Sequence, residues 1–406
     1  MSTFAENISA QLQAIERSGL YRTRQQTASA CAPVVRVRGE DLLAFNSNDY
    51  LGLANDERII EAFKEGLSLY GAGSGASHLI SGHSQAHTRL ENKLAKLLSP
   101  YIEQAGALYF CTGYMANLAV MTSLVDSVKG GAEIFSEERN HASIIDAVRL
   151  SRAAFSVYPH CDTQALSKLL SKSSAKLKVV VTDGVFSMDG DLAPLKELAR
   201  ICESEDAILV VDDAHGFGVL GESGKGMLEH YAVSSPQIIY MGTLGKAAGV
   251  SGAFVCANSV FIDWMIQRAR PYIYTTAAPP ACAHALLRSV DLITGSEGVS
   301  KRKHLQELIH LFKLGVGEQF KLDAKGDVLK NREYRLLDSS TPIQPLIIGS
   351  NEDVLRASQT LFEEGLWVTA IRAPTVPVGS ARLRITMSAT HTAQHVERLL
   401  SVLKKI

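Results

Sequence analysis

The segment Ile208-Leu209-Val210-Val211-Asp212-Asp213-Ala214-His215-Gly216 shows most directly how this chain folds. Four apolar residues are followed at once by two acids and a histidine. An uninterrupted apolar run of this kind is typical of a strand that is buried on both faces, as in a parallel sheet covered by helices. Polar side chains directly after such a strand lie at the carboxyl edge of the sheet, where open α/β sheets bind their ligands. The segment therefore predicts both the class of fold and the position of a site.

Short apolar runs of the same kind recur on both sides of this segment and alternate with helical patterns. The runs that we expect to be strands are 107–110, 133–135, 179–182, 238–241 and 253–256. Strands that alternate with helices in this way form mostly parallel sheets. We therefore predict an α/β fold whose large domain, over residues 46–295, holds a mostly parallel central sheet flanked by helices.

The two ends of the chain predict smaller structures. The apolar residues at helical spacing near the start are Phe4, Ile8, Leu12 and Ile15. They predict a helix over 3–20 that Gly19 closes, and we assign residues 1–45 to an N-terminal helical segment. The stretches after residue 300 are helix-like at 304–320 and strand-like at 345–348, 367–371 and 383–387. They predict a smaller C-terminal α/β domain over 296–406.

The composition is ordinary for a soluble enzyme and argues against several classes of protein. The chain has 406 residues, 46% of them apolar and 20% charged, which suffices for two cores. The net charge of −1 gives no electrostatic reason to expect a nucleic acid or an anionic membrane as a partner. The six cysteines form no C-x-x-C pair, the N-terminus does not resemble a secretory signal, and no apolar run approaches the ~20 residues of a membrane span. We expect a cytoplasmic protein with reduced thiols and neither a membrane nor a nucleic-acid partner.

Two charged residues beside predicted strands are candidates for chemistry. Asp212 ends its strand, and in enzymes that use pyridoxal 5′-phosphate (PLP) an acid so placed keeps the pyridine nitrogen protonated. Taken alone, an acid at the end of a strand is equally typical of a turn with solvated acids. Lys246 ends the segment 243–246, where a P-loop is excluded because Ala247 follows the Gly-Lys pair and Tyr240 occupies the position of the first glycine. A lysine that binds a cofactor covalently and a solvated loop lysine remain the alternatives.

A strand, a glycine turn and a helix start follow one another over residues 110–117. Free backbone N–H groups at a helix start bind phosphate well, so Gly113 and Tyr114 are candidates for a phosphate site, although a plain helix cap fits equally. His141 follows the next predicted strand. Its imidazole could stack on a flat cofactor ring, and a structural histidine is the alternative.

Two other patterns suggest different cofactors. The segment 71–76 fits G-x-G-x-x-A with Glu91 about 20 residues further on, but a dinucleotide site needs a strand directly before it, and residues 59–70 look helical. Three histidines lie nearby, namely His78, His83 and His87. They suggest a metal, yet no set of carboxylates or thiolates accompanies them in the sequence. We therefore predict neither NAD nor a metal.

Six segments in a fixed order carry a family resemblance. They are 46–53 (NSNDYLGL), 80–84 (ISGHS), 184–191 (GVFSMDGD), 212–216 (DDAHG), 243–246 (TLGK) and 370–377 (AIRAPTVP). Together they resemble the α-oxoamine synthases, which are fold-type I PLP enzymes, over nearly the whole chain from about Ile8 to Leu403. The resemblance implies a fold-type I transferase that binds PLP in its large domain and forms a homodimer with a shared active site.

The resemblance also implies roles around the cofactor ring. Lys246 would bind PLP covalently, and Asp212 would pair with the pyridine nitrogen. His215 would hydrogen-bond the ring hydroxyl, together with Ser187. His141 would stack on the ring. By these roles the expected catalytic residues are Lys246, His141, Asp212 and His215.

Around the phosphate, the resemblance implies backbone contacts from Gly113 and Tyr114, with Thr243 beside them. Thr275 and Thr276 would reach the same phosphate from the partner subunit of the dimer. All five residues thus belong to the expected cofactor-binding set.

For the substrates, the resemblance implies that Arg384 holds the carboxylate of the amino acid, where a planar guanidinium is well suited. Asn48 and His141 would also contact the substrate. Arg22 and Thr375 would contact the acyl substrate. Arg24 lies so close to Arg22 that either arginine could fill that role.

The reaction implied by the resemblance is a condensation with loss of CO2. Segments 81–83, 214–215 and 372–377 are similar to the branch of the family that joins L-alanine to a pimeloyl thioester, of CoA or acyl-carrier protein, in biotin synthesis. Ala373 departs from the proline that is frequent there, which is a small change. A glycine-using 2-amino-3-oxobutyrate CoA ligase is the alternative reaction, because alanine and glycine differ by one methyl group. A binding protein without activity is a further alternative, but a cofactor lysine, an acid, two histidines and an arginine are all present.

Overall fold

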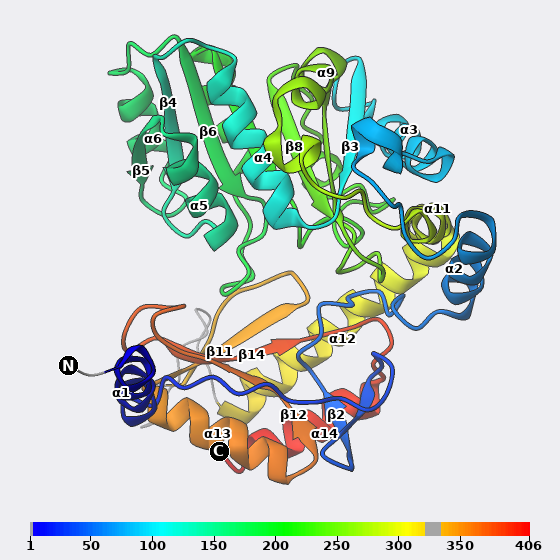
Figure 1. Ribbon diagram of the computed structural model, residues 1–406. Coiled ribbons are helices and arrows are strands. Elements are labelled where there is room, and N and C mark those ends of the chain that lie inside the picture. Colours follow the sequence, from blue (N-terminus) through cyan, green and yellow to red (C-terminus); the bar gives the residue numbers. More distant parts are fainter. Residues whose placement is uncertain (1–2, 321–333) are drawn as a thin grey trace. The chain divides into compact units, whose positions relative to one another are not determined.

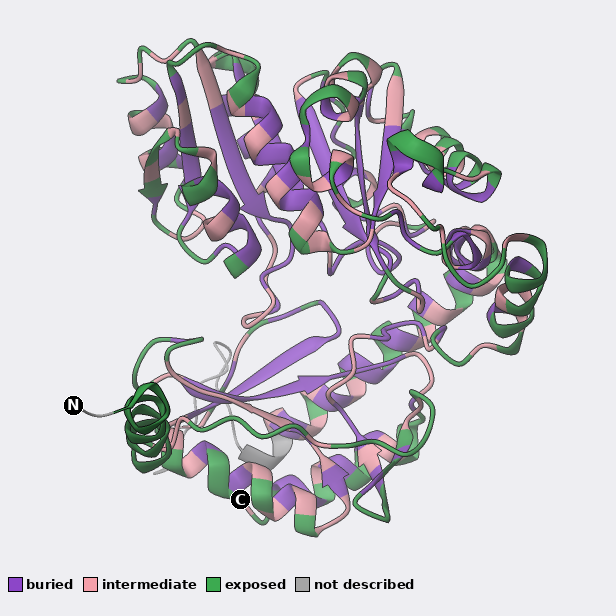
Figure 2. Ribbon diagram, in the orientation of Figure 1, coloured by how far each residue is buried: buried purple, intermediate pink, exposed green. Residues whose placement is uncertain are grey.

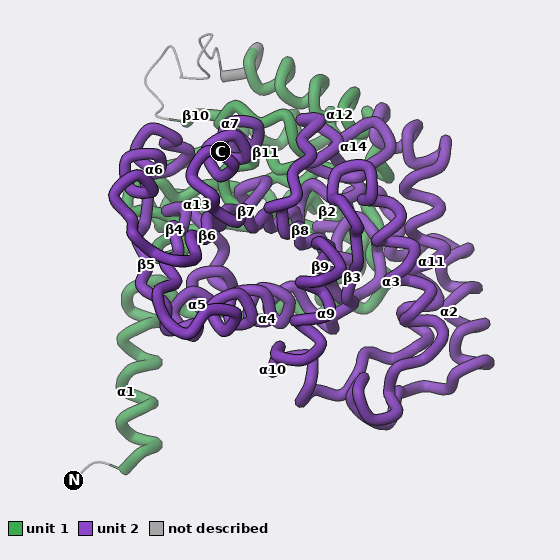
Figure 3. Tube along the Cα trace, turned by 90° about the horizontal axis from the view of Figure 1, so that it is seen from above, with its two compact units in different colours: residues 1–47, 188–190, 305–406 green, residues 48–187, 191–304 purple. Residues whose placement is uncertain are grey.

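The computed structural model describes residues 3–320 and 334–406. These residues form two compact units (Figure 3). Unit 1 comprises Met1–Ser47, Met188–Gly190 and Leu305–Ile406, and unit 2 comprises Asn48–Ser187 and Asp191–His304. The N-terminal segment and most of the C-terminal domain that the sequence predicts therefore fall in the same unit.

Unit 2 is built around a seven-stranded sheet in the order β3-β9-β8-β7-β6-β4-β5 (Figure 1). Its strands are β3 (Ala105–Phe110), β4 (Ala132–Glu137), β5 (Ala154–Tyr158), β6 (Leu177–Asp183), β7 (Ala207–Asp212), β8 (Ile238–Thr243) and β9 (Ala253–Asn258). Strands β5, β4, β6, β7 and β8 are parallel, and β9 is antiparallel to both β8 and β3. The predicted α/β class and mostly parallel sheet are confirmed, and every predicted run of this region lies in a strand.

Helices surround the sheet of unit 2. They are α2 (Glu57–Tyr70), α3 (Gln85–Leu98), α4 (Gly113–Asp126), α5 (Ala142–Ser151), α6 (Thr163–Leu170), α7 (Leu195–Ser204), α8 (Met227–Tyr231), α9 (Ser259–Arg268), α10 (Arg270–Ile273) and α11 (Pro280–Thr294), with a π-helical turn at His78–Gly82. Buried side chains of α4, α5 and α9 share one apolar core with the strands. Figure 2 shows the central strands buried along most of their length, which explains their continuous apolar sequence.

Unit 1 contains two small sheets. One has the order β10-β11-β14-β13 and the other β1-β2-β12. Their strands are β1 (Val34–Val37), β2 (Glu40–Ala44), β10 (Arg335–Leu336), β11 (Ile343–Gly349), β12 (Leu366–Trp367), β13 (Thr369–Ile371) and β14 (Ala381–Thr386). The helices are α1 (Phe4–Arg17), α13 (Asn351–Glu363) and α14 (Ala393–Leu403), and α12 (Ser296–Phe320) begins in unit 2 and continues into unit 1. The strand-like runs predicted at 345–348, 367–371 and 383–387 correspond to β11, to β12 with β13, and to β14.

The predicted N-terminal helix is present as α1. A capping box begins it, because the Glu6 amide donates to Thr3 Oγ1 over 3.2 Å and the Thr3 amide donates to the Glu6 carboxylate over 2.6 Å. Gly19, with φ of +67°, lies just after its end, as expected for a glycine that terminates a helix. Among the described residues, no helix combines the length and the apolar character that crossing a membrane requires.

Candidate active site

The carboxyl ends of β6, β7 and β8 bring three residues of neighbouring strands side by side. Asp183, Asp212 and Met241 are direct partners in the strand register. Asp212 is buried, with 3% of its surface exposed. Its Oδ2 accepts a hydrogen bond from the side-chain amide of Asn117 over 2.8 Å, and its Oδ1 accepts one from the Ala214 amide over 3.0 Å. The carboxylate is thus fixed in one orientation by hydrogen bonds to neutral groups.

His215 and Lys246 meet at this edge of the sheet. Nζ of Lys246 lies 2.7 Å from Nε2 of His215. The histidine is buried and the lysine is half-buried. The other ring nitrogen of His215, Nδ1, lies 2.5 Å from the hydroxyl of Tyr50, and this hydroxyl also lies 3.1 Å from Asn48 Oδ1. One hydrogen-bonded row therefore contains Asn48, which is predicted to contact the substrate, and the predicted catalytic residues His215 and Lys246.

His141 caps the N-terminus of α5 beside the same site. Its amide donates to Asp183 Oδ2 over 2.6 Å, and its Nδ1 lies 2.7 Å from the hydroxyl of Ser143. The Asn117 amide also donates to that hydroxyl, over 2.9 Å, which links His141 to Asp212. Burial lowers the pKa of His141. The negative charge of Asp212 raises this pKa, and the positive charge of Lys246 lowers it. The ring is accordingly neutral near pH 7, which suits stacking on another flat ring.

Asp183 places a second buried carboxyl beside Asp212. Burial raises the pKa of its carboxyl well above the ordinary value, and the neighbouring Asp212 raises it further. Both effects favour the protonated, neutral form of Asp183. Asp212, which is held by hydrogen bonds from Asn117 and Ala214, is the predicted partner of a cation bound at this edge of the sheet.

The predicted phosphate site lies at the start of α4, directly after β3. The hydroxyl of Thr112 accepts from the Met115 amide over 3.2 Å and so caps the helix. The amides of Gly113 and Tyr114 occupy the first turn, where helix N–H groups have no partner within the helix. The Tyr114 hydroxyl points to Asp146 and donates to it over 2.7 Å. This part of α4 can therefore offer backbone groups, rather than the Tyr114 side chain, to an anion.

The remaining predicted cofactor residues are also in unit 2. Thr243 ends β8 and its buried hydroxyl donates to the Gly252 carbonyl over 3.1 Å. Ser187 is half-buried. Thr275 and Thr276 follow α10, with Thr276 exposed and bridged to Ser77. The role of this threonine pair in a partner subunit stays a prediction.

Arg384 lies in unit 1 on β14, between Pro345 of β11 and Thr369 of β13 in the register. It is buried, and its guanidinium donates to the Thr386 hydroxyl over 3.1 Å. Its neighbour Arg382, in contrast, is engaged with Asp189 and with the Met188 carbonyl. Arg382 is thus paired with a carboxylate of the protein, and the role of Arg384 as ligand of the substrate carboxylate stays a prediction.

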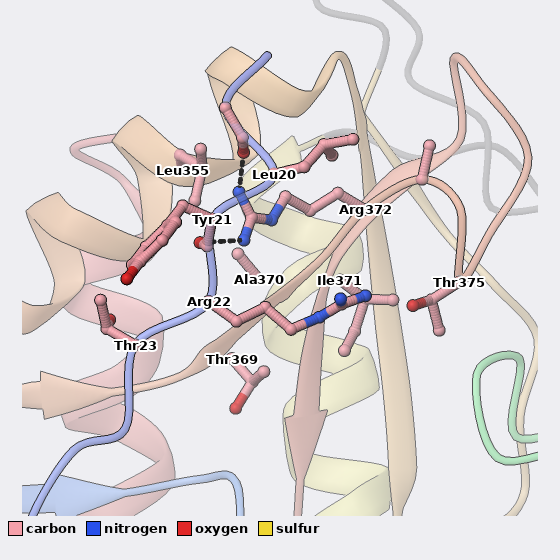
Figure 4. A pocket seen from close by; sticks show the side chains of 12 residues that line it. Leu20, Tyr21, Arg22, Thr23, Leu355, Thr369, Ala370, Ile371, Arg372 and Thr375 are labelled. Carbon is pink, nitrogen blue, oxygen red and sulfur yellow. Dashed lines mark hydrogen bonds between the residues drawn. The ribbon is translucent and has the colours of Figure 1, made fainter. Parts of the chain in front are cut away.

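A pocket of about 610 Å³ in unit 1 brings together the residues predicted for the acyl substrate. Its walls are residues 19–23 and 369–373, with Leu355 and Thr375. Arg372 holds the first wall in place by donating to the carbonyls of Gly19 and Tyr21. Figure 4 shows the Arg22 side chain extended past Ile371 toward Thr375. Arg24 is not among the lining residues, so the geometry favours Arg22 over Arg24.

The structure also explains the glycine-rich segment 71–76 and the three neighbouring histidines. Helix α2 directly precedes Gly71, as the sequence predicts, so the glycine-rich segment lacks the strand of a dinucleotide site. The ligand nitrogens of His78, His83 and His87 lie within 4.8 Å of one another.

One carboxylate approaches these histidines among the described residues, since Glu91 lies 3.8 Å from His83 Nε2, and it is not the set of ligands whose absence the sequence suggests. His87 and Glu91 are one helical turn apart on α3. His87 nevertheless has both nitrogens engaged, one by the Ser84 amide and the other by the Ala278 carbonyl. The cluster is therefore a hydrogen-bonded network around the helix cap.

Four functional neighbours were not identified from the sequence: Tyr50, Asn117, Ser143 and Asp183. Tyr50 belongs to the segment 46–53, and Asn117 is a buried polar residue among the apolar residues of α4. A polar side chain on an otherwise apolar helix is the one signal that could have indicated Asn117.

Comparisons with known proteins agree with this geometry. Residues 40–403 match the family of class I and II aminotransferases. The chain is 55% identical over 406 residues to an 8-amino-7-oxononanoate synthase of Janthinobacterium sp. (strain Marseille), covering 100% of this chain and 99% of the relative. It is 54% identical to the enzyme of the same name from Bordetella petrii, covering 99% and 97%.

Solved structures are also similar. A serine palmitoyltransferase of Sphingomonas wittichii superposes with a TM-score of 0.88 at 27% identity, covering 98% of this chain and 96% of that one. An 8-amino-7-oxononanoate synthase of Francisella tularensis gives a TM-score of 0.72 at 30% identity, covering 90% and 97%. A further structure, described as SPT with PLP as the internal aldimine, gives a TM-score of 0.88 at 27% identity, covering 100% and 98%.

Proposed function

This chain belongs to the class I and II aminotransferase family and, within it, to the 8-amino-7-oxononanoate synthases, and on that premise we propose how its residues act. The protein is a PLP-dependent acyltransferase of biotin synthesis. It joins L-alanine to a pimeloyl thioester and releases CO2 and the thiol carrier. The observation that carries this assignment is the contact of Lys246 with His215 beside the buried Asp212.

The residues at the edge of the sheet fit PLP by their chemistry. The Lys246 amine suits the aldehyde of PLP, and the buried Asp212 carboxylate suits its pyridine nitrogen. The His215 imidazole suits the ring hydroxyl, and the start of α4 suits the phosphate. When bound, PLP supplies an electron-withdrawing ring that stabilises negative charge on the α-carbon of the amino acid. Asp212 would pair with the pyridine nitrogen and keep it protonated, and the neutral His141 would hold the face of the ring.

Lys246 and Arg384 act on the amino acid. The Lys246 amine takes the proton from the α-carbon, and His215 at 2.7 Å orients that amine. The Arg384 guanidinium holds the carboxylate until it leaves as CO2. The α-carbon forms the new bond to the thioester carbonyl, and the carrier thiolate departs. A proton returned to the α-carbon completes the product.

The acyl chain is expected in the pocket of unit 1, and the subunits are expected to pair so that Thr275 and Thr276 serve the partner's phosphate site. Replacing Arg22 by alanine should raise KM for the pimeloyl thioester by about 10-fold with kcat little changed, because one charge-assisted hydrogen bond to the substrate is lost. Thiol release at varied thioester concentration measures this.

Arg24→Ala is the matched control, since this arginine lies two residues away and outside the pocket. Its KM should stay within about twofold of the wild type. A larger rise in KM for Arg24→Ala than for Arg22→Ala would reverse the assignment.

The choice between alanine and glycine tests the proposed reaction directly. One methyl group is worth about 1–3 kcal/mol in a fitted pocket, so kcat/KM should favour L-alanine over glycine by about 10- to 200-fold. The PLP-loaded protein would be assayed for thiol release from pimeloyl-CoA and from the pimeloyl acyl-carrier protein, with mass spectrometry of the product.

Preference for glycine with acetyl-CoA would instead identify the 2-amino-3-oxobutyrate reaction. A protein that takes up PLP but releases no thiol with any pair would support a binding protein without activity.

A further inference from the structure

Tyr50 is the most deeply buried polar group of the row that ends at Lys246. It has 0% of its surface exposed, and its hydroxyl lies 2.5 Å from His215 Nδ1 and 3.1 Å from Asn48 Oδ1. Ring centroids of Tyr50 and His215 are 6.0 Å apart at an angle of 49°, so their contact is made through the hydroxyl and not by stacking. A buried hydroxyl is retained where it makes hydrogen bonds, since leaving one unpaired is costly.

The position of one proton decides what His215 can do. If Tyr50 donates to Nδ1, the neutral imidazole carries its proton on Nε2 and can donate it toward the site. If Tyr50 donates to Asn48 instead, Nδ1 carries the proton and Nε2 can only accept. The Tyr50 hydroxyl lies 2.5 Å from His215 Nδ1 and 3.1 Å from Asn48 Oδ1, so His215 is its nearer partner.

We propose that, in the PLP-bound protein, Tyr50 is a positioning residue that sets the tautomer of His215 by donating to Nδ1 and so holds the proton on Nε2. This inference rests on the proposed function, because Nε2–H of His215 is the donor from which the ring oxygen of the cofactor would accept a hydrogen bond. The distances of 2.5 and 2.7 Å on the two sides of the ring give His215 one partner for each nitrogen. A histidine held in this way has its orientation fixed as well as its tautomer.

Tyr50→Phe tests the inference, because it removes the hydroxyl and keeps the ring that fills the core. The expected result is a decrease in kcat of about 10-fold with KM for alanine nearly unchanged. Without the donor to Nδ1, the imidazolium form of His215 is less disfavoured. The acidic limb of the profile of kcat against pH should therefore move upward by about one pH unit.

Two readouts do not depend on turnover. Nitrogen-15 shifts of His215 in the labelled holoenzyme should report the Nε2-protonated tautomer in the wild type and a mixture in Tyr50→Phe. PLP should also dissociate about 10-fold more readily from the variant. Tyr158→Phe is the control, since it removes the hydroxyl of an equally buried tyrosine outside the site.

An Nδ1-protonated His215 in the wild-type holoenzyme would overturn the inference, even if Tyr50→Phe failed to fold. So would a variant whose tautomer, pH profile and PLP affinity match those of Tyr158→Phe. Loss of the proposed function would be recognised separately: the wild type would then show the expected tautomer but release no thiol with alanine and the pimeloyl thioester.

Discussion

Replacing Lys246 by alanine should lower kcat by about 10³-fold or more. The variant loses both the amine that binds PLP covalently and the base that moves the α-carbon proton, and general base catalysis alone contributes about 10²- to 10⁴-fold. Lys246 is half-buried with its Nζ 2.7 Å from His215, so no other described lysine occupies that position. Thiol release from the pimeloyl thioester measures the loss.

The covalent role of Lys246 has an independent check. Borohydride reduction of the wild type should fix the cofactor on the peptide that contains Lys246, as seen by mass spectrometry, and the variant should give no labelled peptide. Lys172→Ala, at an exposed position, is the control and should match the wild type in both measurements. A label on a different lysine, or turnover within about 10-fold of the wild type, would contradict the assignment of Lys246.

The sheet of unit 2 was predictable because its strands are buried on both faces, which leaves an unbroken apolar signature. β5 escaped the prediction for the same physical reason. It is the edge strand, and Phe155 and Val157 are exposed on it, so its sequence does not read as a buried run. The antiparallel direction of β9 could not be predicted either, since an apolar run does not record the direction of its strand.

Some residues of the site could be predicted from the sequence, and others could not. Asp212, His215 and Lys246 could be proposed because each follows a recognisable strand within a few residues. Their partners could not, since Tyr50 is 165 residues from His215 and Asn117 is 95 residues from Asp212. Such contacts depend on how helices and loops pack against the sheet, which local sequence patterns do not encode.

The choice between Arg22 and Arg24 for the acyl pocket likewise depends on the three-dimensional structure. Arg22 and Arg24 are indistinguishable by sequence alone. They are separated once Arg372 is seen to hold the backbone on either side of Leu20, because the wall so formed includes Arg22 and excludes Arg24.

Asp212→Asn should lower kcat by about 10- to 10³-fold and weaken PLP binding. The amide removes the charge that keeps the pyridine nitrogen protonated. An opposite charge close by shifts a pKa by about 1–3 units, and each unit is worth a factor of ten in the protonation equilibrium of that nitrogen. The amide also cannot satisfy both present donors. If its oxygen accepts from Asn117, its NH2 group faces the Ala214 amide, which then loses its acceptor. Steady-state kinetics and the dissociation of PLP on dialysis measure the two effects.

Asp213→Asn provides a closely matched control for this change. Asp213 is the next residue and is fully buried, but its carboxylate accepts from the Tyr240 hydroxyl and the Met227 amide, each over 2.7 Å. Burial raises the pKa of Asp213 to about 7, so an amide resembles the partly protonated carboxyl already present at neutral pH. The control should therefore bind PLP as the wild type does. If Asp213→Asn lost the cofactor while Asp212→Asn kept it, the partner of the pyridine nitrogen would be Asp213, and the hydrogen bond from Asn117 to Asp212 would have only a structural role.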